Sequence, residues 1–146
     1  DTYIEGMRGR NGMKICVAPY SSVRDEGIIF SFDSPLDLSK EDFISFCWYG
    51  NDSGVQLALR FVSGDWRNQF EYVFLDNWKG WTLLIIPLRA FSVHIGSPSW
   101  DNVNSVGFSF GYCIRHEVTF CLDYLKADIG IHDSLAIPFE RLLDDT

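Results

Sequence analysis

The sequence predicts an all-β fold: a two-sheet antiparallel β-sandwich of the jelly-roll type, with little helix. Short runs in which apolar and polar residues alternate recur along most of the chain, and this period of two is the pattern of half-buried strands. No stretch before Ala127 keeps a period near 3.6 residues, so helix should be scarce. Clusters of Gly, Asn, Asp and Ser separate the runs, and roughly eight or nine strands at such spacing suit a sandwich.

Each alternating run is rich in the β-branched and aromatic residues that strands favour. In chain order, the expected strands are Tyr3–Glu5, Met13–Ala18, Gly27–Phe32, Phe43–Tyr49, Val55–Val62, Gln69–Leu75, Trp81–Ile86, Ser105–Tyr112 and Glu117–Leu125. The tail is different, because the segment that begins at Pro138 could form one or two helical turns. We therefore divide the chain into a β-sandwich domain at residues 1–128 and a C-terminal extension or linker at residues 129–146.

The composition restricts the partners of the chain. A formal net charge of −8 repels phosphate backbones and anionic lipids, so nucleic acids and membranes are poor partners, whereas a neutral polymer is compatible. No apolar run approaches the roughly eighteen residues that cross a bilayer. The first residues do not form a signal segment, so we expect either a removed signal or a piece of a longer protein.

The cysteines show no Cys-x-x-Cys spacing, so zinc and thioredoxin-like chemistry are not indicated. A bridge between Cys113 and Cys121 is awkward, because the hairpin between them does not bring them opposite each other. If a bridge exists, Cys16 with Cys47 is the more plausible pair. The alternative is that all four thiols are buried.

Period two also sorts polar residues onto one face. If the predicted strands are neighbours, the outer face of their sheet collects Tyr49, Gln56, Arg60 and Glu71 over a floor of glycine, serine and alanine. Planar Arg, Gln and Glu groups hydrogen-bond sugar hydroxyls, and aromatic rings stack on the C–H faces of sugars. The alternative is an ordinary polar face on which Arg60 and Glu71 form a cross-strand ion pair.

Two loop tryptophans extend this candidate binding surface. Trp66 and Trp78 lie in segments rich in Gly, Asp, Asn and Lys, where no period requires a core residue. Each is a candidate stacking platform surrounded by hydrogen-bonding side chains. Trp81 and Trp100, in contrast, are expected to be structural.

Catalytic motifs are weak in this sequence. It contains no nucleophile elbow, phosphate loop or paired-histidine metal spacing, and His94, His116 and His132 occur singly. Glu71 with Asp65 or Asp76 could provide the two carboxylates of a glycosidase, but acids are so frequent in this chain that some such pair is always present.

A series of motifs in a fixed order points to a known family. The second half reads Gly80-Trp81, then Ile86-Pro87-Leu88, Phe91, Trp100-Asp101-Asn102-Val103 and finally Asp123, and the first half contains Pro35-Leu36, Phe43-Ile44-Ser45-Phe46 and Val55–Leu59. From about Gly27 to Asp128 the chain resembles jelly-roll carbohydrate-binding modules of the galactose-binding-domain-like group. Each motif alone is weak, and their order and spacing carry the resemblance.

The resemblance implies a non-catalytic domain that accompanies a glycoside hydrolase or a similar enzyme. Its partner would be a polysaccharide or oligosaccharide, most plausibly a plant cell-wall glucan or hemicellulose. The domain would be extracellular or at the cell surface, as a monomer within a larger multidomain protein. Related modules often hold one structural Ca²⁺, for which Asp123 matches one ligand and Glu5, with Asp25 as the alternative, is the candidate for a second.

Two other classes share the pattern. The complex I intermediate-associated domain has much of the same motif order and would make this chain a protein-interaction or assembly-factor domain. A structural domain of an adhesin, capsid or tail fibre would instead form stable trimers or fibres.

Overall fold

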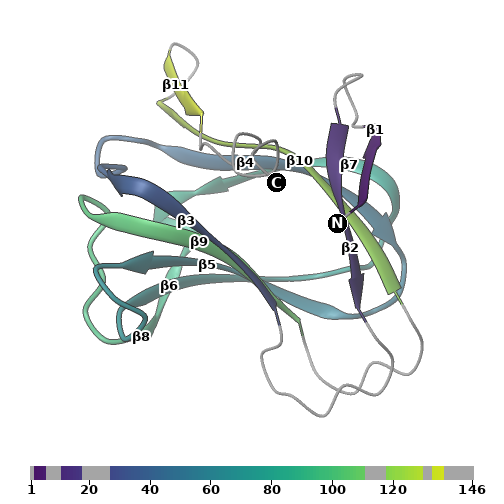
Figure 1. Cartoon of the computed structure of the whole chain (residues 1–146), viewed down its shortest axis with the longest axis horizontal. Coiled ribbons are helices and arrows are strands. Elements are labelled where there is room, and N and C mark those ends of the chain that lie inside the picture. The colour runs from purple at the N-terminus through teal and green to yellow at the C-terminus, as the bar shows by residue number, and fades with distance from the viewer. Residues whose placement is uncertain (1, 6–10, 18–26, 111–117, 130–132, 137–146) are drawn as a thin grey trace.

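The described residues form two antiparallel sheets that face each other. The structure, a computed structural model, describes residues 2–5, 11–17, 27–110, 118–129 and 133–136. In Figure 1 the two sheets lie one above the other as separate layers. Within the described residues the helical structure is η1 (Leu88–Ala90), a short 3₁₀ turn after the proline that ends a strand. The prediction of a two-sheet all-β fold with little helix is confirmed.

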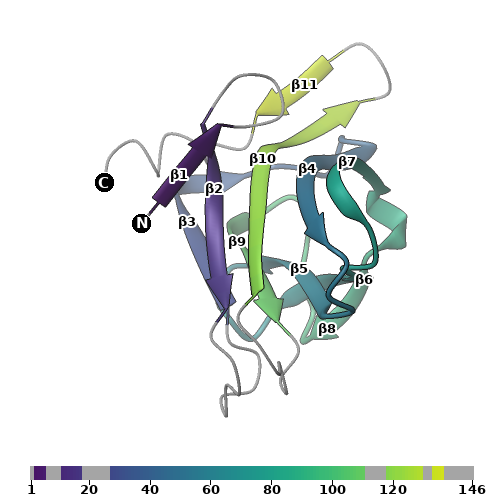
Figure 2. The ribbon, with the colours of Figure 1, turned by 90° about the vertical axis from the view of Figure 1, so that its right-hand side faces the viewer.

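The six-stranded sheet has the order β1-β2-β10-β4-β7, and β11 pairs with β10. Its strands are β1 (Thr2–Glu5), β2 (Asn11–Val17), β4 (Phe43–Asn51), β7 (Lys79–Pro87), β10 (Val118–Ile129) and β11 (Asp133–Ala136). Figure 2 shows β1, β2, β10, β4 and β7 side by side from left to right.

The five-stranded sheet has the order β3-β9-β5-β6-β8. Its strands are β3 (Gly27–Leu36), β5 (Gln56–Ser63), β6 (Gln69–Leu75), β8 (Ser92–Ile95) and β9 (Val103–Phe110). Strands β9 and β5 are far apart in the sequence, but they pair with each other along most of their length.

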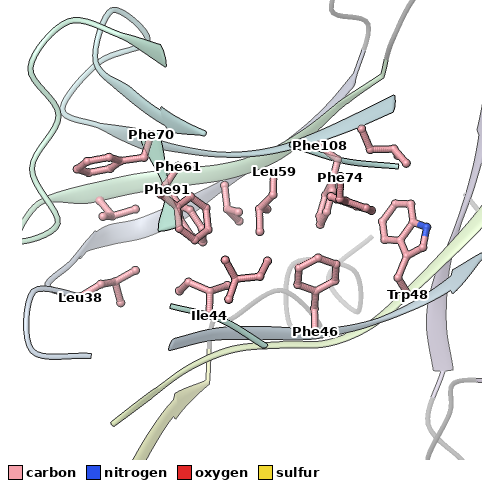
Figure 3. Packing of buried hydrophobic residues seen from close by; sticks show 14 residues of the cluster. Leu38, Ile44, Phe46, Trp48, Leu59, Phe61, Phe70, Phe74, Phe91 and Phe108 are labelled. Atoms are coloured by element: carbon pink, nitrogen blue, oxygen red, sulfur yellow. The ribbon is translucent and has the colours of Figure 1, made fainter. Parts of the chain in front are cut away.

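The core lies between the two sheets and consists of the inward set of each alternating strand. The six-stranded sheet contributes Ile44, Phe46 and Trp48 of β4, and the five-stranded sheet contributes alternate residues of β5, β6 and β9. Figure 3 shows Phe46 and Trp48 projecting from one layer towards Phe74 and Phe108 of the other. Because each strand buries one set of side chains here, the opposite set is left on the two outer faces.

The sheet continues beyond the predicted domain boundary. The boundary after residue 128 falls inside β10, which runs to Ile129, and β11 lies in the predicted extension. Asp133 pairs with Ile129, and Ala136 pairs with Lys126. Part of the predicted extension therefore belongs to the six-stranded sheet. The predicted helical turns from Pro138 lie outside the described residues.

The strand order contradicts a bridge between Cys16 and Cys47, the pair that the sequence favours if any bridge exists. Cys16 pairs with Thr119, and Cys47 pairs with Asp123, so β10 lies between the two cysteines. Two strand spacings separate their Cα atoms by about 10 Å, whereas a disulfide spans at most about 7 Å. The proposed pairing is therefore wrong. Cys113 lies outside the described residues.

A peptide map checks this register directly. After proteolysis without reductant, we expect mass spectrometry to detect no peptide that links Cys16 to Cys47, because β10 separates their strands. The reduced and alkylated digest is the control for coverage of both peptides. A linked Cys16–Cys47 peptide in the folded protein would contradict the strand order.

Candidate functional site

The outer face of the five-stranded sheet carries one row of residues that crosses every strand. Arg60 of β5 lies opposite Glu71 on one side and Gly107 on the other. Gly107 in turn lies opposite Ile29 of β3, and Glu71 lies opposite Ser92 of β8. The row thus places a glycine between an exposed isoleucine and a charged pair.

The charged part of the row is a fixed cluster of hydrogen-bonding groups. Arg60 Nε and Nη2 both lie 2.8 Å from Glu71 Oε2, and Nη1 donates to Ser109 Oγ at 3.0 Å. His94 Nδ1 lies 3.3 Å from the same Glu71 oxygen. The Arg60 and Glu71 side chains are 15% and 16% exposed, so they are held in place yet still reach the surface. We call Arg60, Glu71, His94 and Ser109 the Arg60 cluster.

Both interpretations of Arg60 and Glu71 in the sequence therefore describe part of the structure. They form the cross-strand ion pair, and they also lie together on an outer sheet face. His94 was missed as a site residue because the short strand β8 was not predicted. Its residues Ser92–Ile95 alternate between polar and apolar, but four residues are too few to distinguish a strand from a loop by sequence alone, and all four are exposed.

A hollow of about 170 Å³ lies beside the Arg60 cluster. Its floor includes Gly107 and Ser109, and Ile29, Arg60, Trp66 and Gln69 also line it. The hollow exists because β9 carries glycine and serine here while its neighbours carry larger side chains. Its volume is below the roughly 300 Å³ of pockets that enclose drug-sized ligands, so it suits one small ring of a longer ligand.

Trp66, a stacking platform predicted from the sequence, lines the edge of this hollow. It lies in the turn between β5 and β6 and is 68% exposed. The Arg67 guanidinium carbon lies 5.8 Å from the centre of its ring, and Gln69 Nε2 donates to its backbone oxygen at 2.7 Å. A large exposed ring next to fixed donors and acceptors is the arrangement that binds a sugar ring.

Gln56 shares this face, but Tyr49 does not. Gln56 is exposed at the start of β5, on the same side of the strand as Arg60. Tyr49 lies in β4, opposite Trp81, and their ring centres are 5.5 Å apart at an angle of 81°. The predicted common face is therefore wrong for Tyr49, because β4 belongs to the six-stranded sheet and its outer face points the other way.

Trp78 is less exposed than the sequence suggests. Its ring stacks on Phe74 with 6.3 Å between ring centres, and its Nε1 atom is buried. Gly50 makes room for it, since a Cβ atom there would lie 2.8 Å from the Trp78 ring. Trp78 packs against the core and is less accessible than Trp66, and its role as a stacking platform stays a prediction.

Asp76 also has a structural position. It is fully buried, and its Oδ1 atom accepts the Asn51 N–H at 2.9 Å. Its Oδ2 atom accepts the Ser53 N–H at 3.0 Å and the Ser53 hydroxyl. Both carboxylate oxygens thus tie the β4–β5 loop to the β6–β7 loop, which opposes a role for Asp76 as the partner of Glu71 in acid–base chemistry.

The predicted calcium ligands lie on strands that are not adjacent. Glu5 is in β1 and Asp123 is in β10, and β2 lies between these strands. Their side chains are outside the part that the structure describes. Where side chains are described, no group of three or more His, Cys, Asp or Glu residues is placed to hold a metal ion. The calcium site stays a prediction.

None of the helical structure in the described ranges has the length and apolar character needed to cross a membrane.

The fold and this face can now be compared with known proteins. No protein-family model and no curated protein sequence matches the chain. Among solved structures, it is similar to the family 11 carbohydrate-binding module from Clostridium thermocellum in complex with a β-1,3-1,4-mixed-linked tetrasaccharide. The TM-score is 0.70 and the sequence identity is 20%, and the match covers 90% of this chain and 83% of that chain.

Two further structures share the architecture. One is the family 11 carbohydrate-binding module of a cellulosomal cellulase of Clostridium thermocellum, with a TM-score of 0.68, 20% identity, and coverage of 90% of this chain and 83% of that chain. The other is a family 28 carbohydrate-binding module specific for non-crystalline cellulose, with a TM-score of 0.60, 14% identity, and coverage of 88% and 81%. The similarity confirms the predicted fold, a β-sandwich of the kind found in these modules.

Proposed function

We propose that this domain is a non-catalytic module that binds a polysaccharide chain on the outer face of the five-stranded sheet. The observation that carries the proposal is the hollow over Gly107, with the exposed Trp66 ring at its edge and the Arg60 cluster beside it. A ring that can stack and a set of fixed hydrogen-bonding groups are the two features that sugar recognition requires.

The ligand class follows from charge and from the similar structures. With a formal net charge of −8, the chain favours an uncharged polymer over an acidic one such as pectin. The structures of similar fold include one bound to a mixed-linked β-glucan oligosaccharide and one specific for non-crystalline cellulose. We therefore propose a β-linked glucan or a related hemicellulose. We also propose that the domain works outside the cell, within a larger polysaccharide-degrading protein.

Affinity gel electrophoresis tests the proposal. Mixed-linked β-glucan, xyloglucan, xylan, galactomannan and pectin are cast separately into native gels, and we expect at least one uncharged β-linked polymer to retard the protein. Trp66→Ala should weaken this binding at least about tenfold, because the stacking ring is lost. Arg60→Ala should weaken it too, because Glu71 and Ser109 lose the group that fixes them.

Tyr49→Ala is the matched control, since it removes an aromatic ring from the outer face of the other sheet. It should leave retardation unchanged. If no polymer retards the wild-type protein, or if Tyr49→Ala abolishes binding while Trp66→Ala does not, the proposed face is not the ligand site.

The protein-interaction alternative has one observation in its favour. Leu83 and Ile85 of β7, an edge strand of the six-stranded sheet, are 44% and 57% exposed. A failure of every polymer in the panel would favour that alternative, and a change in sedimentation of the Leu83→Ser, Ile85→Ser double variant would support it.

A further inference from the structure

The turn that carries Trp66 is closed by its own hydrogen bonds. We call residues Ser63–Asn68 the Trp66 loop. The Ser63 N–H donates to the Asn68 carbonyl oxygen at 2.9 Å, and the Asn68 N–H donates to the Asp65 carbonyl oxygen at 3.0 Å. Asp65 Oδ1 also accepts the Arg67 N–H at 2.8 Å. These bonds fix the backbone on both sides of the tryptophan.

A second turn braces the Trp66 loop from outside. The β8–β9 turn donates the Ser97 N–H to Asn68 Oδ1 at 3.0 Å and the Ser99 N–H to Ser63 Oγ at 2.9 Å. Gly96 has a φ of 71° and packs so closely on the Trp66 loop that a Cβ atom there would overlap the Arg67 carbonyl oxygen and Asn68 Oδ1. The two turns therefore fit together only because Gly96 has no side chain.

A third contact comes from the central strand β9. Asn104 Oδ1 accepts the Gly64 N–H at 2.5 Å. The Trp66 loop is thus bonded to two segments that lie about 30 to 40 residues further along the chain, as the sequence separations of 29, 36 and 40 show.

The hydrogen bonds that brace the Trp66 loop would favour binding if Trp66 contacts a ligand. The core cannot position a ring that is 68% exposed, so the backbone beneath it must do so. A ring that is already held where it binds does not lose its freedom on association, and ordering a side chain on binding costs about 0.5–1.5 kcal/mol. We propose that Asn68 is a positioning residue, which links the β8–β9 turn to the Trp66 loop and keeps Trp66 at the edge of the hollow. This inference rests on the proposed function, because it gives the bracing a role in binding.

The test combines affinity with a signal from Trp66 itself. Asn68→Ala removes the acceptor of the Ser97 N–H, and we expect affinity for mixed-linked β-glucan to fall about threefold to tenfold. In protein labelled with 5-fluorotryptophan, the ¹⁹F resonance that is missing from Trp66→Phe should shift and narrow. The resonances of Trp48, Trp78 and Trp81, which lie away from the two turns, should stay in place, which shows that the fold is intact. Gly96→Ala should have the same effect by pushing the two turns apart.

Two further variants separate positioning from a general structural effect. Asn68→Asp keeps an oxygen acceptor for the Ser97 N–H and should restore near wild-type binding. Asn77→Ala removes an exposed asparagine from the loop between β6 and β7 and should change neither readout. In a Trp66→Ala background, Asn68→Ala should weaken binding no further, because Asn68 acts through Trp66.

Each outcome decides between the two proposals. If Asn68→Ala binds like the wild type and leaves the Trp66 resonance unchanged, or weakens Trp66→Ala by the same factor, the positioning role is overturned while polysaccharide binding stands. If the wild-type protein binds no polysaccharide, the proposed function fails. In that case an unchanged Trp66 resonance in Asn68→Ala overturns the positioning role as well. A shift of the Trp66 resonance, without a shift of the control resonances, supports the positioning role.

Discussion

Replacing Trp48 by alanine is expected to lower the free energy of unfolding by about 3–5 kcal/mol. Trp48 is fully buried between the sheets. Its ring centre lies 5.5 Å from that of Phe74 and 5.1 Å from that of Phe108, both on the opposite sheet, and 6.3 Å from that of Phe46. The alanine variant loses these contacts and leaves a cavity that rigid strands on both sides cannot close. Urea denaturation followed by far-ultraviolet circular dichroism measures the loss.

Trp66→Ala is the matched control for this prediction, because it removes the same side chain from a solvent-exposed turn. Its effect on stability should stay within about 0.5 kcal/mol. If the two tryptophan variants were equally stable, the burial of Trp48 between the sheets would not contribute to stability.

Replacing Asp76 by alanine should cost about 3 kcal/mol of stability. The carboxylate accepts two backbone N–H groups and one hydroxyl, and all three donors lose their partner when it is removed. A buried donor without a partner costs about 1–3 kcal/mol, and the partial exposure of Asn51 and Ser53 reduces the total. Asp76→Asn should lose less stability than Asp76→Ala but still be less stable than the wild type, because one carboxylate oxygen is replaced by an N–H₂ group that faces a donor.

Asp37 provides a matched control with the same chemistry in solvent. Its Oδ1 atom accepts the Ser39 N–H at 3.0 Å and the Ser39 hydroxyl at 2.6 Å, as Asp76 does with Ser53. These hydrogen bonds lower the pKa of Asp37 below its ordinary value, but the group is fully exposed. Asp37→Ala should therefore change the denaturation midpoint little. A comparable loss in both variants would show that the burial of Asp76 does not matter.

The sequence predicts strands well because period two is a local property. Leu57, Leu59 and Phe61 alternate with polar or small residues, and each is buried as the alternation requires. What period two cannot show is to which sheet a strand belongs. Tyr49 and Arg60 both point outward from their strands, yet they lie on opposite faces of the molecule, because β4 pairs with β7 and β10 rather than with β5.

The two loop tryptophans illustrate a second limit of local sequence. Trp66 and Trp78 occur in similar polar segments, but Trp66 is exposed whereas Trp78 is half-buried. The difference comes from Gly50 and Phe74, which offer Trp78 a surface on which to pack. Phe74 is close to Trp78 in the sequence, but Gly50 belongs to β4, far earlier in the chain, so composition near the tryptophan does not reveal the whole surface.

Local sequence patterns do not predict the hollow, although they identify some of the residues that line it. The sequence indicated a floor of small residues and the charged pair. Their meeting beside Trp66 depends on the register of β5 against β9, which places Gly107 next to Arg60. Register is set by the whole sheet, and a shift of one residue would move the entire set to the opposite face.

The contrast between Trp48 and Trp66 also gives the molecule two separate optical reporters. The fluorescence of an indole buried among apolar side chains has a shorter wavelength than that of an indole in water. Unfolding should therefore shift the emission of Trp48 to the red. Trp66 already faces water, and its emission should instead shift to the blue when a sugar ring covers it. These two of the five tryptophans thus respond to denaturation and to ligand occupancy in opposite spectral directions.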